Sequence, residues 1–249
     1  MQFKLYLCVH GSSRGEGPGV RLKPSGIEWL GDIPQHWEVK RLKYQAIVQP
    51  SNVDKKSNEN EHPVLLCNYM DVYKNEFINS DIKFMEATAN EAEILKFKIK
   101  SGDVLVTKDS ETPDDIAVPA LVKEEFENVL CGYHLSQIRP LKNKLVGEFL
   151  FRVFQSQKFN AQFQVAANGV TRYGLSSSHI ANAFIPLPPL KEQNAIATFI
   201  DNKTDQISNS ISKIESEIEL MQEYRTALIS EVVTGKVDLR TYKSKNPEA

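Results

Sequence analysis

The sequence lacks several features that would each point to a particular class of protein. It contains no run of 18 apolar residues, so it predicts no membrane-spanning helix. The apolar N-terminal stretch FKLYLCV is too short for the core of a signal peptide, and GSSRGEGPG follows it instead of a small-residue cleavage site. We therefore expect no association with a membrane.

Cysteine is scarce, with three residues that lie far apart: Cys8, Cys67 and Cys131. Their number is odd and no CxxC motif occurs, so the pattern indicates neither a disulfide framework nor a zinc site. We expect these thiols to be buried as small apolar groups in a cytoplasmic, reducing environment.

Positive charge is not in excess. The 249 residues include 30 Lys and Arg against 32 Asp and Glu, which gives a formal net charge of −2. The charge of the whole chain therefore does not favour nucleic-acid binding, and such a role would require a local basic patch.

Motifs for catalysis and for cofactor binding are also missing. There is no GxSxG, Walker or GxGxxG motif, and the five histidines show no metal-ligand spacing. The glycine cluster at residues 11–19 does not match a P-loop. The adjacent Asp114 and Asp115 could hold a metal ion, but paired carboxylates in a loop are more often only solvated. We expect no cofactor, no metal ion and no catalytic residue.

One tetrapeptide comes near a catalytic motif. Methyltransferases that modify the adenine amino group carry Asn/Asp-Pro-Pro-aromatic, and Leu187-Pro188-Pro189-Leu190 is the nearest match here. It has neither the polar first residue that would hold the amino group nor the aromatic ring that would stack on a flipped base. This comparison argues against a methyltransferase and supports the expectation that the chain is not an enzyme.

The pattern of the chain predicts an α+β fold in four parts. Residues 1–23 read as a flexible leader, 24–189 as a β-rich domain, 190–235 as a long helix and 236–249 as a C-terminal tail. Within the domain we predict strands in 63–73, 101–109 and 128–140, surface loops at 51–62 and 110–119, and helical structure in 143–165.

The clearest periodic signal begins at Ile200. Seam positions recur at alternating steps of four and three residues, which is a heptad repeat over more than four heptads. The seam comprises Ile200, Thr204, Ile207, Ile211, Ile214, Ile218, Met221, Arg225, Leu228 and Val232. A helix of 44 residues would be roughly 66 Å long. We therefore expect it to project and to pair with another helix, with folding back on its own domain as the alternative.

Five segments, taken in order, resemble the specificity subunits of type I restriction–modification systems. They are SGIEWLGDIPQHWEVKRL, SGDVLVTKDSETPDDIA, ANGVTRYGLSSSHI, IPLPPLKEQNAIATFID and LISEVVTGKVDLR. The resemblance covers residues 24–240 and ends on the long heptad helix.

The resemblance implies a non-catalytic subunit that recognises double-stranded DNA. In this family two target-recognition domains each read half of a bipartite site, and two long helices pack antiparallel as a spacer. Adenine methyltransferase subunits and restriction subunits carry out the chemistry. This chain has one such domain and one helix, so it resembles a half-length subunit, which could form a homodimer, join another specificity half or be a truncated product.

Two loops and one basic segment are candidates for contacting DNA, because they carry groups that read base edges or bind phosphates. The candidate residues are Lys108, Ser110 and Thr112; Gly169, Thr171, Arg172, Tyr173 and Gly174; and Lys40, Arg41 and Lys43. Each set has a plainer interpretation, as a glycine-containing turn or a solvated strand face. A coiled-coil interaction module without DNA recognition is the alternative function.

Overall fold

The structure is a computed structural model that describes residues 21–169, 172–240 and 242. The predicted leader up to residue 20, Cys8, Thr171 and most of the C-terminal tail lie outside the described residues. The chain divides into two units, one up to Ala197 and one from Thr198. All strands in the described residues belong to the first unit, and a long helix begins in it. The α+β class and the long C-terminal helix are therefore confirmed.

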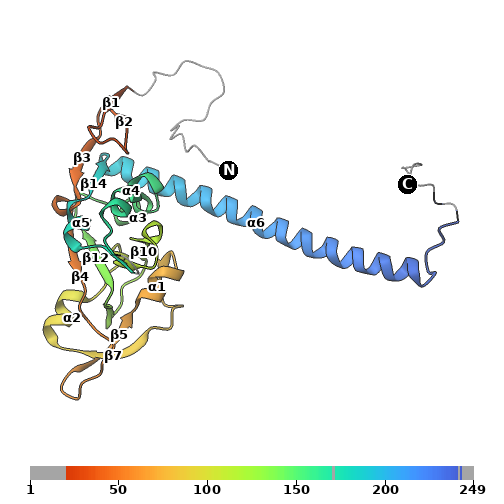
Figure 1. Cartoon of the computed structure of the whole chain (residues 1–249), viewed down its shortest axis with the longest axis horizontal. Coiled ribbons are helices and arrows are strands. Elements are labelled where there is room, and N and C mark those ends of the chain that lie inside the picture. The colour runs from red at the N-terminus through yellow and green to blue at the C-terminus, as the bar shows by residue number, and fades with distance from the viewer. Residues whose placement is uncertain (1–20, 170–171, 241, 243–249) are drawn as a thin grey trace. The chain divides into compact units, whose positions relative to one another are not determined.

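A mixed five-stranded sheet forms the centre of the first unit, in the order β4-β12-β8-β10-β6 (Figure 1). Its strands are β4 (Ala46–Pro50), β12 (Leu135–Pro140), β8 (Val104–Thr107), β10 (Pro119–Val122) and β6 (Phe77–Ile78). The β10–β6 pair is parallel and the other pairs are antiparallel. All four residues of β8 are buried, as suits a β-branched, apolar sequence in a central strand.

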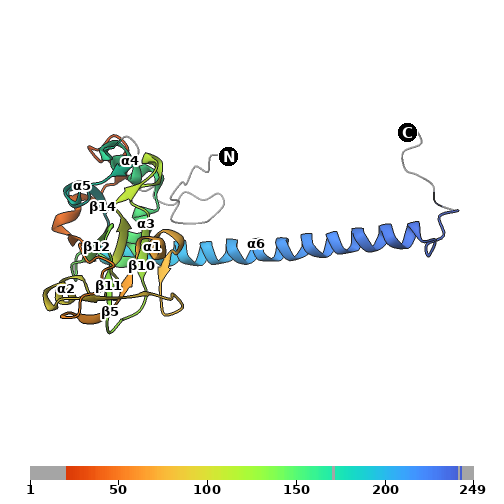
Figure 2. The same cartoon turned by 60° about the horizontal axis from the view of Figure 1, so that its bottom comes forward.

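A second sheet has the order β11-β5-β7 and shares its core with the central sheet. Its strands are β11 (Val129–Cys131), β5 (His62–Cys67) and β7 (Met85–Ala89). Leu66 of β5, Leu105 of β8 and Leu135 of β12 belong to one buried cluster. In both views β5 lies toward one end of the first unit (Figures 1 and 2).

Three pairs of short strands complete the β-structure. They are β1 (Leu22–Pro24) with β2 (Asp32–Pro34), β3 (Glu38–Arg41) with β14 (Phe184–Leu187), and β9 (Asp109–Ser110) with β13 (Tyr173–Gly174). All three pairs are antiparallel. The last two join segments that lie far apart in the sequence, so they close the unit by non-local contacts.

Short helices lie between the strands. They are α1 (Tyr69–Lys74), α2 (Glu91–Phe97), α3 (Gly147–Phe154), α4 (Gln157–Ala166) and α5 (Ser177–Asn182), with 3₁₀ turns η1 (Leu42–Tyr44) and η2 (Pro113–Asp115). α2 begins at a capping box, in which Asn90 Oδ1 accepts from the Glu93 amide and the Glu93 carboxylate accepts from the Asn90 amide.

The phenylalanines of α3 and α4 form a buried aromatic cluster. Phe154 stacks on Phe163 with ring centroids 5.5 Å apart, and both rings meet the edge of Phe159. All three side chains are at most 2% exposed. The aromatic stripe of residues 149–163 is therefore core structure, which agrees with its helical spacing.

The structure corrects two of the sequence-based element predictions. Residues 63–73 are not one strand, because the chain leaves β5 and forms α1 after Asn68. Residues 128–140 are two strands, interrupted where His134 adopts a φ of +70°. The helical structure predicted in 143–165 is confirmed and consists of two helices, since the α3 helix ends near Gln155.

The long helix α6 (Leu190–Val233) is fixed to the first unit by its first turn. Gln193 is fully buried there, and its Oε1 accepts from the Val146 amide at 2.9 Å. Its Nε2 donates to the carbonyls of Pro188 at 2.9 Å and Lys144 at 3.2 Å. Three backbone groups from two segments therefore depend on one side chain.

Glu192, next to Gln193, also holds the start of α6 on the first unit. Its two carboxylate oxygens accept from Trp37 Nε1 at 2.9 Å and contact His36 Nε2 at 2.8 Å. Ile196 and Ala197 are buried one turn further on. The PLPPLKEQ segment thus connects strand β14, the β3 region and the start of α6.

In the second unit, the apolar side chains of α6 face solvent. Ile207, Ile211, Ile214 and Ile218 are each 49–59% exposed, and Leu228 is 41% exposed. Within the part of the chain that the structure describes, no helix combines the length and hydropathy needed to cross a membrane.

Replacing Gln193 by alanine is expected to destabilise the first unit. The substitution removes the partner of the Val146 amide and of the Pro188 and Lys144 carbonyls, of which the bond to Pro188 is buried, and it costs about 1–3 kcal/mol of unfolding free energy. Urea unfolding of the full chain, followed by the fluorescence of Trp29 and Trp37, measures this cost. The control is Asn194→Ala, an exposed neighbour, with an expected effect within about 0.5 kcal/mol. Equal effects of the two variants would contradict the role of Gln193.

Candidate nucleic-acid interface

The two loops predicted to contact DNA lie side by side in the structure. Strand β9 pairs with β13, so that Ser110 faces Tyr173 and Asp109 faces Gly174. The Leu175 amide extends this pairing by donating to the Lys108 carbonyl at 2.8 Å. A ladder of two residues per strand therefore brings together residues that are about sixty positions apart.

Asp109 lies between two side chains of this surface, those of His134 and Arg172. It contacts His134 Nδ1, and its carboxylate lies 3.9 Å from Arg172 Nη2. The Arg172 side chain is 60% exposed, whereas that of Asp109 is only 23% exposed. The carboxylate thus lies near the Arg172 guanidinium, which stays accessible to a ligand.

Lys108 is turned toward the protein. Its ammonium group donates to the Ser51 carbonyl at 3.3 Å and lies 5.4 Å from the centre of the Tyr133 ring. Burial lowers the pKa of Lys108, which the nearby Asp109 carboxylate opposes. Tyr133 covers this lysine and is itself 49% exposed.

Ser110 and Thr112 differ in their access to solvent. Ser110 is only 6% exposed, and its Oγ accepts from the Thr112 amide at 3.2 Å. The Thr112 side chain is exposed at the start of η2. Ser110 therefore shapes the loop, while Thr112 presents its hydroxyl at the surface.

Two tyrosines that the sequence analysis missed border this surface. Tyr69 and Tyr73 stack with ring centroids 5.6 Å apart, and the Tyr73 hydroxyl donates to Asp115 at 2.6 Å. That hydrogen bond raises the pKa of Tyr73. Burial raises the pKa of Tyr69, as does the charge of Asp115, and the Arg172 charge lowers it. Their i,i+4 spacing in the sequence could have indicated that both rings lie on one face of a helix.

The glycines of the second loop have different roles. Gly169 has a φ of +153°, and a Cβ there would lie 2.0 Å from the Arg172 carbonyl oxygen. Gly174 pairs with Asn168 through two backbone hydrogen bonds, and an added Cβ would meet nothing closer than 3.7 Å. A side chain at residue 169 would therefore collide with the backbone of Arg172, so this position requires glycine.

The third candidate segment lies on another sheet. Lys40 pairs with Glu38 at 3.3 Å, and Lys43 lies over the Tyr44 ring. The Arg41 guanidinium lies over Phe184 at 4.6 Å and reaches Asn182. These side chains belong to the β3–β14 pair and to η1, not to the β9–β13 surface.

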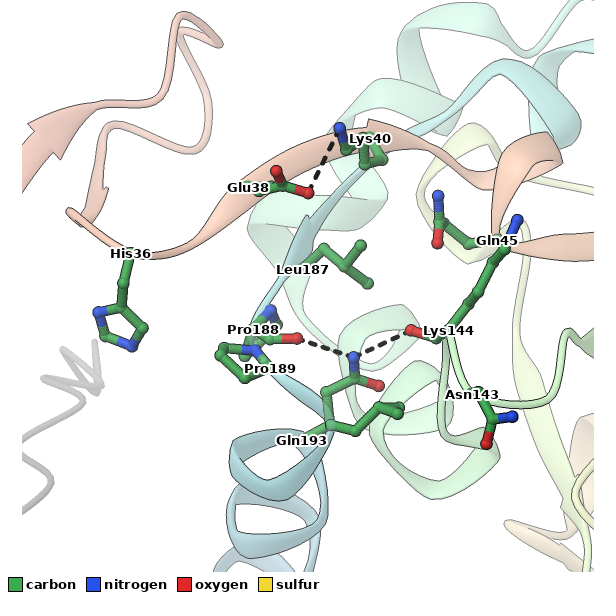
Figure 3. Close-up of a pocket in the computed structure, with 11 residues that line it drawn as sticks. His36, Glu38, Lys40, Gln45, Asn143, Lys144, Leu187, Pro188, Pro189 and Gln193 are labelled. Atoms are coloured by element: carbon green, nitrogen blue, oxygen red, sulfur yellow. Dashed lines mark hydrogen bonds and ion pairs between the residues drawn. The ribbon is translucent and has the colours of Figure 1, made fainter.

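An open pocket of about 420 Å³ lies beside the β3–β14 pair, and Figure 3 shows its lining. Gln193 occupies its base with hydrogen bonds to Lys144 and Pro188, while the Glu38–Lys40 pair lies at its rim. The Gln193 side chain is buried at the base because it binds the backbone carbonyls of Lys144 and Pro188.

No group of three or more His, Cys, Asp or Glu side chains within the described residues is placed to hold a metal ion.

Comparison with known families identifies the family to which this chain belongs. The family model of the type I restriction modification DNA specificity domain matches residues 34–220. The chain belongs to this family. The match includes the β9–β13 surface, the PLPPLKEQ segment and more than half of α6.

The curated relatives of the chain include specificity subunits of type I restriction enzymes from bacteria and archaea. That of the type I restriction enzyme EcoKI of Escherichia coli is 26% identical over 202 residues, which cover 76% of this chain and 42% of the relative. That of the MjaVIII enzyme of Methanocaldococcus jannaschii is 23% identical over 212 residues, covering 85% and 48%. The chain thus spans about half the length of the curated relatives it matches.

Solved structures of the family share the fold. The crystal structure of the HsdS subunit of Thermoanaerobacter tengcongensis aligns with a TM-score of 0.59 and 18% identity, over 86% of this chain and 53% of that chain. A chain from a structural study of type I R-M complex assembly also gives 0.59, with 17% identity, over 81% and 46%. Both alignments again cover about half of the known chains.

Replacing Gly169 by alanine is expected to weaken the backbone pairing of Asn168 with Gly174. The new methyl group collides with backbone, and a strained residue of this kind costs about 1–3 kcal/mol. Hydrogen exchange of the Gly174 amide, which donates to the Asn168 carbonyl, measures the local opening. Gly174→Ala is the matched control for stability, since its methyl group has space. Unchanged protection of residue 174 in the Gly169→Ala variant would contradict the assigned strain.

Proposed function

We propose that this chain is a non-catalytic DNA sequence-specificity subunit of a type I restriction–modification complex and reads one half of a bipartite site. The observation that carries this proposal is the family match across residues 34–220, which spans the folded unit and much of α6. A coiled-coil module without DNA recognition is not favoured, because it would leave the match to the folded unit unexplained.

The proposed reading surface is the one around the β9–β13 ladder. Arg172 presents an exposed guanidinium, which can fork onto guanine O6 and N7 or bind a phosphate. Thr112 presents a hydroxyl, and the Tyr69–Tyr73 stack offers aromatic surface beside these groups. Gly169, Thr171, Tyr173 and Gly174 remain candidates for close backbone or side-chain contact with DNA.

Carboxylates on a DNA-binding surface would repel phosphates unless they are paired or accept hydrogen bonds. Asp109 lies 3.9 Å from the Arg172 guanidinium and contacts the His134 ring, and Asp115 accepts from the Tyr73 hydroxyl. Carboxylates can also accept from the amino group of cytosine in the major groove. We therefore expect Asp115 to face base edges rather than phosphates. Lys40, Arg41 and Lys43 would be a separate phosphate patch.

The domain division follows from this function. We assign target recognition to residues 24–189, the spacer helix to 190–235, and a leader and tail to 1–23 and 236–249. Methyltransferase subunits would methylate adenine, restriction subunits would cleave, and α6 would pair with a second specificity half. We infer a cytoplasmic complex, where the free thiols of Cys67 and Cys131 stay reduced.

Arg172→Ala is expected to weaken binding to the recognised duplex by about 1–3 kcal/mol in the complex with methyltransferase subunits. If Arg172 binds a phosphate, the slope of log affinity against log salt also falls by about one. Titrations at several salt concentrations measure both effects. Lys158→Ala removes one exposed positive charge from α4 and is the control. Unchanged affinity and slope in the Arg172 variant would place the reading surface elsewhere.

If two copies of this chain pair through a two-fold axis, both halves of the recognised site have the same sequence in inverted orientation. Methylation mapping in cells that express this chain as their sole specificity subunit is therefore expected to give an interrupted palindrome. An asymmetric bipartite site would show that the second half comes from a different chain.

A further inference from the structure

The pocket beside the β3–β14 pair contains a buried polar side chain that has no partner. Gln45 is only 7% exposed, and its carboxamide points toward the middle of the residues drawn in Figure 3. Its backbone bonds to Leu42 and Leu141, whereas no hydrogen bond within the described residues involves its carboxamide. Buried polar groups normally have partners, so a ligand in the pocket that supplies them is favoured.

Gln193, the other buried glutamine of this pocket, differs from Gln45 in its contacts. The Gln193 carboxamide makes three hydrogen bonds, all of them to backbone groups of the protein. It is therefore part of the fold. The carboxamide of Gln45 has two N–H donors and one acceptor oxygen left for a ligand.

The charged groups that line the pocket favour a ligand with one negative charge. They include two lysines, Lys40 and Lys144, and one glutamate, Glu38. The Glu38 carboxylate lies 3.3 Å from the Lys40 ammonium group and offsets one of the two positive charges. The remaining positive charge suits a single carboxylate better than a polyanion.

The first turn of α6 adds positive potential to one wall of the pocket. Pro188, Pro189 and Leu190 line this wall. The amides of Glu192 and Gln193 donate to the Pro189 carbonyl, and the earlier amides of the turn have no acceptor inside the helix. The N-terminus of a helix attracts anions for this reason.

Glu192 is the carboxylate of the protein that could compete for this helix terminus. Its two oxygens contact Trp37 Nε1 at 2.9 Å and His36 Nε2 at 2.8 Å. Glu192 is not among the residues that line the pocket. Its contacts with Trp37 and His36 therefore leave the pocket itself open to an anion from outside.

A phosphate of duplex DNA fits this pocket poorly. Each phosphate has charged neighbours along the strand, and the Glu38 side chain, which is 60% exposed, would repel them. Duplex DNA is also stiff, so a phosphate within it cannot reach a carboxamide as deeply placed as that of Gln45. These features favour a narrow ligand with a single charge at its end.

The rest of the lining is apolar. Leu187 and Leu190 line the pocket together with Pro188 and Pro189, and the volume of about 420 Å³ is typical of a ligand site. The end of a peptide chain combines one carboxylate, a peptide group and a side chain. A primary carboxamide can both donate to and accept from a peptide group, and an apolar last side chain suits this wall.

We propose that this pocket binds the C-terminal end of a partner polypeptide whose last residue is apolar. The terminal carboxylate lies toward Lys40, Lys144 and the first turn of α6, and the Gln45 carboxamide bonds to the last peptide group. The last side chain packs against Leu187 and the two prolines. This site goes beyond the proposed function, because the pocket belongs to the β3–β14 pair and not to the β9–β13 surface.

Nuclear magnetic resonance of the full chain, with nitrogen-15 in its glutamine side chains, tests the proposal. N-acetyl-leucine mimics the end of a peptide chain, and it is expected to shift the side-chain amide signals of Gln45 and Gln193 with an affinity on the order of 1 mM. N-acetyl-leucinamide lacks the carboxylate and is expected to bind at least about tenfold more weakly.

Gln45→Met tests the role assigned to the carboxamide. The variant identifies the Gln45 signals by their loss, and the Gln193 signals then measure binding, which is expected to weaken by about fivefold. Gln49→Met is the control, because Gln49 belongs to the adjoining strand β4 and does not line the pocket. Equal affinities of the two variants, both folded by circular dichroism, would overturn the role of Gln45.

Other outcomes in the unsubstituted chain would overturn the proposal as well. Equal binding of N-acetyl-leucine and N-acetyl-leucinamide, or no saturable shift with either, would exclude a carboxylate site. Leucine itself adds an ammonium group beside Lys40 and Lys144, so tighter binding of leucine would assign the pocket to a free amino acid. Tighter binding of inorganic phosphate or of a short DNA duplex would assign Lys40 to a phosphate contact instead.

Discussion

The pairing of β9 with β13 is the contact on which the candidate interface depends. Two residues on each strand join loops that the sequence separates by about sixty positions. Without this ladder, Arg172 would have no fixed relation to Asp109, and the second loop would lose its position beside α1. A two-stranded ladder of this length is weak by itself. Its surroundings stabilise it, because η2 is held by side chains of α4 and the Leu175 amide bonds to Lys108.

The start of α6 is likewise held by a few contacts between segments that lie far apart in the sequence. One buried glutamine and one glutamate connect the start of the helix to three other segments. Because buried polar groups need partners, these side chains specify one geometry for the first turn. The remainder of the helix offers an apolar seam that is far more exposed than the core residues. The chain therefore combines a rigid start of the helix with a surface suited to pairing.

Much of this organisation could be predicted from the sequence, and the parts that could not have physical reasons. The heptad seam is periodic over many residues, so α6 was predicted closely. The α1 helix was missed because PVLLCNY is rich in β-forming residues, whereas the helix depends on the local cap of Asn68 and Asp71. The break at His134 depends on a positive φ that no composition signals.

The candidate site was predicted only in part. Arg172, Thr112 and the glycines were named from their chemistry and do meet on one surface. Tyr69, Tyr73 and His134 were not named, because their position beside Arg172 comes from tertiary contacts. Lys108 was expected to face a ligand, but its ammonium group bonds to a carbonyl of the protein. Residue type identifies the side chains that could contact DNA, and packing decides which of them face outward.

Hydrogen exchange of the assembled complex with methyltransferase subunits, with and without a duplex that contains the recognised site, tests the central claim most directly. The account predicts that DNA slows exchange in residues 69–75, 109–115 and 168–175, which form the surface around the β9–β13 ladder. Protection confined to the β3–β14 pair, with these three segments unchanged, would contradict it.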